Sequence, residues 1–426
     1  MTVPPQGPNL LFVGGARAVP ISTAMAGEAL AQARIRGIRT HIVNEAEVLA
    51  DTPTVNAAAD AVSAIDFTRS EETVAWARDR LAAGERFDAV FALQEMAQVA
   101  VAEVAEAVGA PGNPPDAVRR IRTKDLCRAA LAAAGFAQPA VRLAADADEA
   151  AAFLAQSSGP WIVKPRDAMG SIGVSLVRDA ADLPGAIALL PDAAPFLVEE
   201  FVEGPEFSVE GVFLNGEPRV LAITAKEKAP PPFFVETGHV LPAELAEEDR
   251  REIEERVSAA LSILELRTGA FHVELWLTAD GIVLGEVHGR FGGDWIHTML
   301  QHAVPGLEVF GLVFDDMLGR SGSHGGLEPT RGAAVRYLIP PPGKLAAIEG
   351  WGEVLAHPAV LHARLSAQPG DVIKPLRQSS DRVGFVVVGA DDAALARKLA
   401  ADLVDSVRFV IEDSPAERLP GQWSLT

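Results

Sequence analysis

The hydrophobic and polar positions of the first hundred residues alternate between short apolar runs and longer amphipathic stretches. The apolar runs predict strands at residues 9–14, 40–43 and 87–93. The amphipathic stretches predict helices at residues 16–36 and 95–108. Strands that alternate with helices at this spacing are typical of a parallel α/β unit. Residues 111–115, Pro-Gly-Asn-Pro-Pro, follow and predict a linker.

The pattern of the remaining chain is more mixed. It predicts strands at residues 161–164, 174–177, 196–202, 334–339, 384–388 and 407–411. It predicts helices at residues 116–134, 243–266 and 391–404. Asn215-Gly216 between two apolar runs predicts a tight hairpin, and the Gly- and Ser-rich stretch 321–326 predicts a second linker.

A second hairpin is the most informative element. The alternating runs 271–277 and 282–288 are joined by a short loop that ends at Gly281, a residue suited to the left-handed conformation such a loop needs. A three-residue loop makes Thr278 pair with Ile282. We therefore expect a regular antiparallel pair of strands here.

In that register Glu274 lies opposite Glu286, and His272 lies opposite His288. All four side chains project from one face, because side chains alternate faces along a strand. Two carboxylates whose Cβ atoms lie roughly 5 Å apart repel each other, and a divalent cation such as Mg²⁺ removes that repulsion. The alternative is a pair of solvated glutamates on an exposed face.

Composition narrows the class of protein. A chain of 426 residues with 49% hydrophobic and 22% charged residues suits two or three folded domains. The 37 basic and 58 acidic residues give a net charge of −21. This charge argues against nucleic acid or an anionic membrane as the main partner.

The expected compartment is the cytoplasm. The single cysteine, Cys127, cannot form an intramolecular disulfide, which fits a reducing environment. No basic segment followed by an apolar stretch begins the chain, and no run approaches the length of a membrane span.

Four further elements point to a nucleoside triphosphate. Lys124 follows the linker, and Lys164 ends an apolar strand just before the Gly-containing loop 169–174. Backbone N–H groups of such a loop approach phosphate oxygens, and a lysine adds charge. An acidic bend at 199–206 offers backbone groups to adenine and a carboxylate to ribose. Arg290 offers a fork of donors to a carboxylate or to the γ-phosphate.

In this order the elements resemble the ATP-grasp superfamily over residues 9–318. The resemblance implies Glu274, Glu286 and His288 at the metal positions, with Arg290, Lys164 and both glutamates as the catalytic groups. The nucleotide-binding residues it implies are Lys124, Lys164, Met169, Gly170, Ser171, Ile172, Gly173, Glu199, Glu200, Phe201, Val202 and Glu206. The family usually has asparagine where His288 stands. An imidazole suits Mn²⁺ or Zn²⁺ better than Mg²⁺, so His288 either shifts the metal preference or hydrogen-bonds to phosphate, whereas His272 is expected to be a packed histidine.

Within the superfamily the chain resembles the L-amino-acid ligases most closely. The resemblance lies in residues 234–243, in the turn 290–296 and in the stretch 384–389 with its following helix. It implies that the substrate side is formed by His239, Arg290, Gly292, Gly293, Asp294 and Trp295. For Trp295 the alternative is that the ring packs into the core.

The resemblance also implies the architecture: an N-terminal pre-ATP-grasp α/β domain (1–115), a two-lobed ATP-grasp domain (116–325) and a small C-terminal α+β domain (326–426). The implied activity is ATP-dependent joining of two amino acids, as a dipeptide or γ-glutamyl-type amide, through an acyl phosphate. The implied cofactors are ATP and Mg²⁺ or Mn²⁺. The implied partners are amino-acid substrates, and a homodimer is an alternative to a monomer. The alternatives are a bicarbonate-dependent carboxylase or purine-pathway ligase, and a non-catalytic nucleotide-binding regulator.

Overall fold

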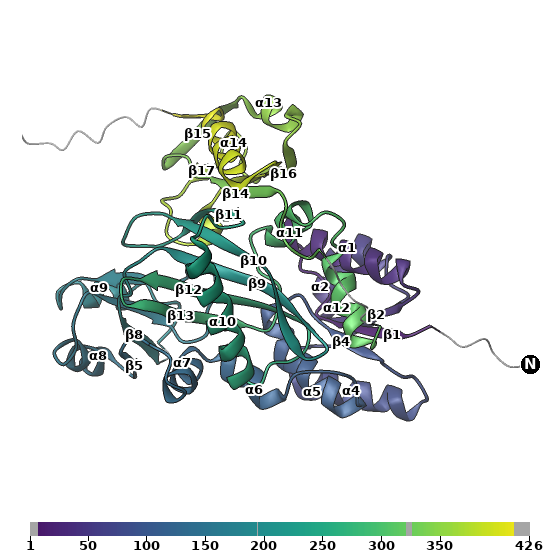
Figure 1. Cartoon of the computed structure of the whole chain (residues 1–426). Coiled ribbons are helices and arrows are strands. Elements are labelled where there is room, and N and C mark those ends of the chain that lie inside the picture. Colours follow the sequence, from purple (N-terminus) through teal and green to yellow (C-terminus); the bar gives the residue numbers. More distant parts are fainter. Residues whose placement is uncertain (1–6, 194, 321–325, 413–426) are drawn as a thin grey trace, which may run out of the picture.

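The computed structural model describes residues 7–193, 195–320 and 326–412. Its N-terminal part is a parallel sheet with strand order β3-β2-β1-β4, flanked by helices (Figure 1). The strands are β1 (Asn9–Val13), β2 (Arg39–Asn44), β3 (Ala61–Ala64) and β4 (Ala89–Phe91). The helices are α1 (Pro20–Ile35), α2 (Ala46–Asp51), α3 (Pro53–Asn56), α4 (Ser70–Ala82), η1 (Glu95–Ala97) and α5 (Gln98–Val108). The parallel α/β unit predicted from the alternation is confirmed.

The next part is a four-stranded antiparallel sheet with order β5-β8-β6-β7. Its strands are β5 (Val141–Ala144), β6 (Trp161–Pro165), β7 (Ser175–Val177) and β8 (Phe196–Glu200). The helices of this part are α6 (Pro115–Arg122), α7 (Lys124–Ala133), α8 (Ala147–Leu154) and α9 (Leu183–Ile187).

The largest sheet has eight strands in the order β13-β12-β9-β10-β11-β14-β18-β16. These strands are β9 (Glu206–Leu214), β10 (Glu217–Lys228), β11 (Glu236–Leu241), β12 (Ala270–Thr278), β13 (Gly281–His288), β14 (Gly332–Leu338), β16 (Val360–Leu365) and β18 (Gly384–Ala390). Because β11 pairs with β14 in the register Gly238↔Arg336 to Leu241↔Ala333, the C-terminal strands extend the central sheet rather than standing apart from it.

The remaining elements cover or follow this sheet. A three-stranded sheet consists of β15 (Gly343–Glu349), β17 (Val372–Ile373) and β19 (Arg408–Ile411). The helices are α10 (Glu247–Ile263), α11 (Ile296–Ala303), α12 (Val309–Met317), α13 (Trp351–Ala356), η2 (Ser379–Asp381) and α14 (Ala393–Asp405). Among the described residues, no helix is both long and apolar enough to cross a membrane.

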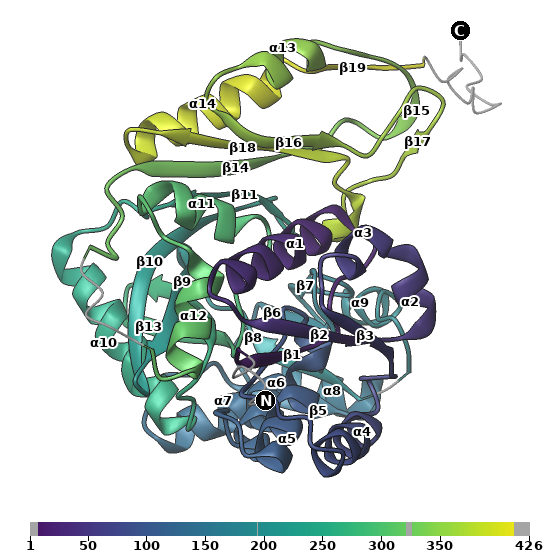
Figure 2. The same cartoon turned by 90° about the vertical axis from the view of Figure 1, so that its right-hand side faces the viewer.

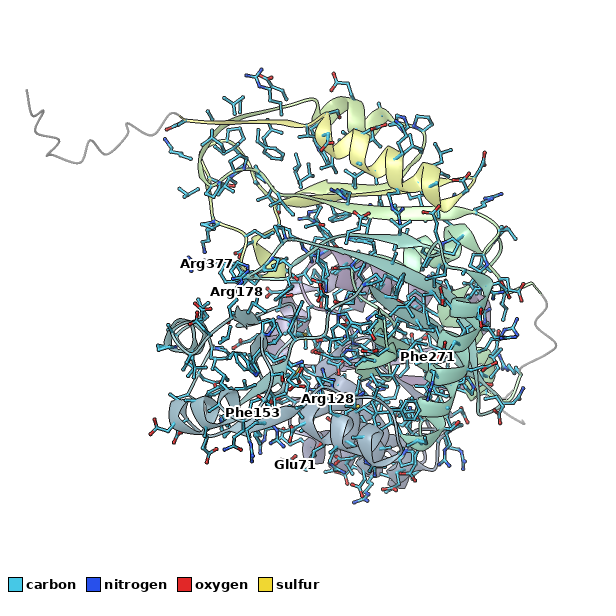
Figure 3. All side chains as sticks on the ribbon, turned by 60° about the vertical axis from the view of Figure 1, so that its left-hand side comes forward. Glu71, Arg128, Phe153, Arg178, Phe271 and Arg377 are labelled. Atoms are coloured by element: carbon cyan, nitrogen blue, oxygen red, sulfur yellow. The ribbon has the colours of Figure 1, made fainter. Side chains whose placement is uncertain are left out.

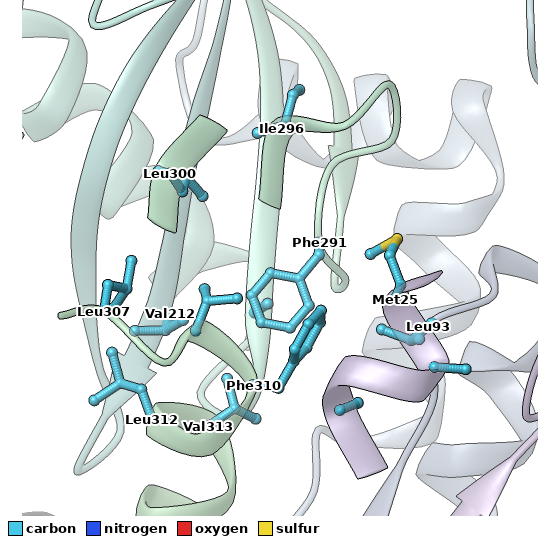
Figure 4. Close-up of a cluster of buried hydrophobic side chains, with 14 of the residues drawn as sticks. Met25, Leu93, Val212, Phe291, Ile296, Leu300, Leu307, Phe310, Leu312 and Val313 are labelled. Carbon is cyan, nitrogen blue, oxygen red and sulfur yellow. The ribbon is translucent and has the colours of Figure 1, made fainter. Parts of the chain in front are cut away.

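A shared hydrophobic core joins the N-terminal part, the central sheet with α11 and α12, and the C-terminal strands β14 and β18. Figure 2 shows α1 beside α12, and Figure 4 shows Phe291, Phe310, Val212 and Met25 in one cluster. The rings of Phe291 and Phe310 meet edge to face, with centroids 5.1 Å apart. At the rim of this core, Arg36 Nε donates to Asp315 Oδ2 at 2.8 Å. The N-terminal part is therefore anchored to α12.

The single helix predicted at 116–134 is wrong, because the structure has two helices there. Thr123 adopts an extended conformation, with φ −103° and ψ 102°, and divides the segment into α6 and α7. Lys124 is consequently the first residue of a helix instead of an interior one. The predicted linker at 321–326 lies outside the described residues, except for Gly326.

The two predicted hairpins differ in outcome. The Asn215-Gly216 turn is confirmed, since Leu214 pairs with Glu217 and both turn residues have positive φ. In the other hairpin the predicted pairing of Thr278 with Ile282 is wrong, because Thr278 pairs with Gly281 across a two-residue turn.

A β-bulge in β13 restores the predicted pairing further along this hairpin. The register shifts between Val273 and Leu275, so that Glu274 faces an extra residue on the opposite strand. His272 then pairs with His288 as predicted. A bulge leaves one residue unpaired and locally re-aims the side chains.

Candidate functional site

A cavity of about 200 Å³ lies between the antiparallel β5–β8 sheet and the central sheet. Many of the residues predicted to bind nucleotide or metal line it, although they come from five strands, one helix and three loops. These lining residues are Lys124, Lys164, Met169, Gly170, Ser171, Ile172, Glu199, Glu200, Phe201, Val202, Glu206, Glu274, Glu286, His288 and Arg290. Gly173 instead lines a neighbouring cavity of about 430 Å³.

The two hairpin carboxylates each have a lysine beside them. Lys226 Nζ lies 3.0 Å from Glu274 Oε2, and Lys124 Nζ lies 3.5 Å from Glu286 Oε2. Burial would raise the pKa of Glu274, but the charge of Lys226 and a hydrogen bond with His272 hold it well below its ordinary value. Burial likewise opposes ionisation of Glu286, and Lys124 outweighs it and lowers the pKa. Two ionised carboxylates on one cavity wall are hard oxygen donors, which fits a magnesium ion.

His288 is held by a residue of the N-terminal part. Its Nδ1 lies 3.0 Å from Glu95 Oε2, and its Nε2 lies 3.5 Å from Glu286 Oε2. Arg290 also donates through Nε to Glu95. Among the described residues, no group of three or more His, Cys, Asp and Glu side chains is arranged as a metal cage. The role of His288 as a metal ligand therefore stays a prediction.

Glu95 was missed by the sequence reasoning, which assigned it only to a helix. It lies 193 residues before His288 in the chain, and no local pattern marks such a distant pair. Burial would raise its pKa, but Arg290, His288 and Arg122 together hold the pKa well below the ordinary value. The N-terminal part thus contributes a carboxylate to the site.

Lys164 is fixed through a buried ion-pair network. Arg128, labelled in Figure 3, donates two hydrogen bonds to Glu199 at 2.8 and 2.9 Å. Lys164 Nζ lies 3.0 Å from the same carboxylate. Burial lowers the pKa of Lys164, while Glu199 opposes that effect. A pre-positioned, partly desolvated lysine is suited to binding phosphate oxygens.

The predicted phosphate loop begins beside Lys124. Lys124 Nζ donates to the carbonyl of Ala168 at 2.8 Å. Gly170, Ser171 and Gly173 have φ of 69°, 58° and 67°, so the loop turns through the left-handed region three times. Left-handed residues occur in the backbone concavities that bind anions, so the role of this loop in phosphate binding stays a prediction.

The acidic bend after β8 is only partly available for a nucleotide. The N–H groups of Glu200 and Phe201 donate to the carbonyls of Ala140 and Pro160, so adenine recognition would rest on other backbone groups. Glu206, predicted near ribose, forms ion pairs with Lys226 and Lys228. The sequence pattern does not indicate either lysine as a site residue. The alternation in β10 places both on the same face of the strand, but it does not show which side chains lie opposite them.

Behind Glu274 lies a buried carboxylate–imidazole pair. His272 Nδ1 lies 2.9 Å from Glu210 Oε2, and His272 Nε2 lies 3.4 Å from Glu274 Oε1. Burial would lower the pKa of His272, but Glu210 and Glu274 raise it to about 9. The expectation of a packed, hydrogen-bonded histidine is confirmed. A Cβ atom at Gly292 would lie 2.9 Å from this pair, so glycine is required there.

The remaining substrate-side residues lie outside the cavity lining. Asp294 accepts from His239 at 3.0 Å and from two nitrogens of Arg382 at 2.9 and 3.0 Å. Trp295 is 4% exposed, and its ring lies 4.1 Å from that of His362 and 4.7 Å from that of Phe385. The structure therefore places Trp295 in the core, as the alternative held. Gly293 is in the same turn, between Gly292 and the Asp294 cluster.

Comparison with known families agrees with this geometry. Residues 157–299 match the model of the ATP-grasp domain, and residues 336–412 match the model of the L-amino acid ligase C-terminal domain 2. The first match covers Glu274, Glu286 and the predicted phosphate loop. The second covers the strands that extend the central sheet.

Individual relatives support the same assignment. Protein y4rH of Sinorhizobium fredii is 30% identical over 361 residues, which are 80% of this chain and 72% of y4rH. The alanine–anticapsin ligase of Bacillus subtilis is 27% identical over 59% of this chain, and the match spans 57% of that ligase. The crystal structure of L-amino acid ligase from Bacillus licheniformis superposes with a TM-score of 0.80 at 24% identity, covering 96% of this chain and 100% of that structure. The chain belongs to the ATP-grasp ligases, in the group that carries the L-amino acid ligase C-terminal domain.

Proposed function

We propose that the protein joins two amino acids in an ATP-dependent reaction through an acyl-phosphate intermediate. The observation that carries this proposal is the pair of ionised glutamates, Glu274 and Glu286, on one wall of a cavity lined by Lys124 and Lys164. The two lysines offer positive charge to the phosphates, and the two carboxylates offer oxygen ligands to the divalent cation. The C-terminal domain of the L-amino acid ligases favours amino acids as substrates over bicarbonate.

The chemistry follows from the weakness of a carboxylate as an acylating agent. A carboxylate oxygen of one amino acid attacks the γ-phosphorus, the bond to the β-γ bridging oxygen breaks, and ADP leaves. The amine of the second amino acid then attacks the carbonyl carbon, loses a proton and displaces phosphate. Catalysis of this kind rests on positioning and charge neutralisation.

Each group has a place in this scheme. Lys124 and Lys164 hold the phosphates, and Arg290 steadies the γ-phosphate and the acyl phosphate. Glu274 and Glu286 hold Mg²⁺, which when bound neutralises phosphate charge. Glu95 fixes the orientation of Arg290 and His288 through its two contacts.

The proposal is tested by a phosphate-release screen of all amino-acid pairs with ATP and Mg²⁺. We expect release that requires both an amino acid with a free carboxylate and one with a free amine, together with an equal amount of amide. Bicarbonate without amino acids serves as the control. Phosphate release stimulated by bicarbonate alone would contradict the proposal, and so would ATP binding without ADP formation in every mixture.

A further inference from the structure

One short stretch of the C-terminal part contacts several parts of the candidate site. It comprises residues 378–382, includes the single turn η2, and precedes β18. Figure 3 labels the neighbouring Arg377, on the stretch that descends from the C-terminal strands. We refer to residues 378–382 as the docking segment.

The first contact of the docking segment is with the phosphate loop. The N–H of Ser379 donates to the carbonyl of Gly170 at 3.1 Å. On the other side of the loop, Lys124 donates to the carbonyl of Ala168. The loop is therefore held at two carbonyl groups, one contacted by the N-terminal residue of α7 and one by the C-terminal part of the chain.

The second contact is with the central sheet. The hydroxyl of Ser379 donates to Glu236 Oε2 at 3.2 Å, and Arg382 Nη1 lies 3.3 Å from the carbonyl of Glu236. Glu236 is itself 3.7 Å from Lys226 in the cavity. The docking segment thus bridges the phosphate loop and the strand that faces it.

Arg382 fixes the position of this bridge. Its Nε donates to the carbonyl of Ser379 at 2.9 Å, and its two terminal nitrogens hold Asp294 in the turn after Arg290. Its guanidinium lies 3.5 Å above the ring of Tyr337. A guanidinium group that is stacked on a ring and hydrogen-bonded at every nitrogen has little conformational freedom. Arg382 therefore holds Ser379 and the turn that contains Asp294 at a fixed separation.

We propose that the docking segment is a positioning element for the reaction. Ser379 holds the phosphate loop closed over the cavity, and Arg382 ties that closed position to the turn beside Arg290. Its catalytic consequence rests on the proposed function, because an acyl phosphate that is exposed to water is hydrolysed before the amine attacks. The C-terminal part would then decide how much ATP is used for each amide formed.

Two substitutions at one position test the proposal. Ser379→Ala removes only the hydroxyl, whereas Ser379→Pro also removes the N–H that binds Gly170. Proline is compatible with this site, because Ser379 is the first residue of a turn and Gln378 before it is extended, with φ −150° and ψ 164°. The difference between the two variants therefore isolates one hydrogen bond.

The readouts are hydrogen exchange of residues 169–174 in the presence of a non-hydrolysable ATP analogue, and the ratio of phosphate released to amide formed. We expect loop exchange roughly fivefold faster in Ser379→Pro than in Ser379→Ala, the factor for one hydrogen bond of typical net strength. We expect the phosphate-to-amide ratio to rise above one in Ser379→Pro alone. If Ser379→Pro does not fold, Arg382→Lys is compared in the same way with Arg408→Lys, whose partner is the exposed Glu349.

Equal loop exchange in the two Ser379 variants would overturn the proposal. Faster exchange with an unchanged phosphate-to-amide ratio would overturn the part that assigns protection of the intermediate. If no amino-acid pair gives an amide, the proposed function fails, whereas the exchange comparison still decides whether the docking segment holds the loop.

Discussion

Replacing Glu286 with Gln is expected to lower kcat by on the order of 10²–10³ or more, the range seen when one preorganised electrostatic contact to a reacting group is lost. The carboxylate lies at the cavity wall with 30% of its side chain exposed, so the isosteric amide leaves the packing intact. It removes the negative charge that we propose binds the divalent cation, and it removes the ion pair with Lys124. Turnover is measured as phosphate release at saturating Mg²⁺.

The matched control is Glu255→Gln, which changes an exposed glutamate of α10 whose partner is Arg251 at 3.9 Å. This control should retain the activity of the unchanged protein. Circular dichroism and the unfolding temperature should be the same in both variants. Full activity of Glu286→Gln at saturating Mg²⁺ would refute the metal assignment.

Replacing Trp295 with Ala is expected to lower the free energy of unfolding by about 3–5 kcal/mol, the usual cost of truncating a buried aromatic residue. The ring is packed against His362 and Phe385 of the C-terminal strands, so its removal leaves a cavity between the turn and these strands. Denaturant unfolding measures the loss. Because Trp295 is outside the cavity lining, the product profile of the folded variant should not change.

Ile263→Ala is a suitable control, because Ile263 is a large apolar residue that is 41% exposed. It should lower the stability far less than Trp295→Ala does. A shift toward larger amino-acid products in the folded Trp295 variant would contradict the core assignment and return Trp295 to the substrate pocket.

Much of the fold was predictable because its signals are local. The alternation of strands and helices before residue 110 and the Asn215-Gly216 turn depend on neighbouring residues, and both are confirmed. The bulge opposite Glu274 was not predicted, although an isolated glycine within a strand pattern, here Gly285, is a signal for one. A Cβ atom at Gly285 would lie 2.9 Å from the ring of Trp276.

The candidate site was predictable only in part, for a physical reason. The alternation of one hairpin indicates Glu274 and Glu286, the end of an apolar strand before a Gly-containing loop indicates Lys164, and the preceding linker indicates Lys124. The partners of Glu95 and Lys226 come from strands that are distant in the sequence. Sequence periodicity shows on which face of a strand a side chain lies, but not which residue it contacts. The contact between Ser379 and Gly170 is likewise a product of tertiary folding alone.

The most direct measurement follows oxygen from the substrate to phosphate. An amino acid whose carboxylate carries ¹⁸O is incubated with ATP, Mg²⁺ and the amine partner found in the phosphate-release screen, and the released phosphate is examined by mass spectrometry. An acyl phosphate transfers one carboxylate oxygen to each phosphate, so we expect one ¹⁸O atom per phosphate and an equal amount of amide. Phosphate that contains no ¹⁸O while amide is formed would contradict the acyl-phosphate route.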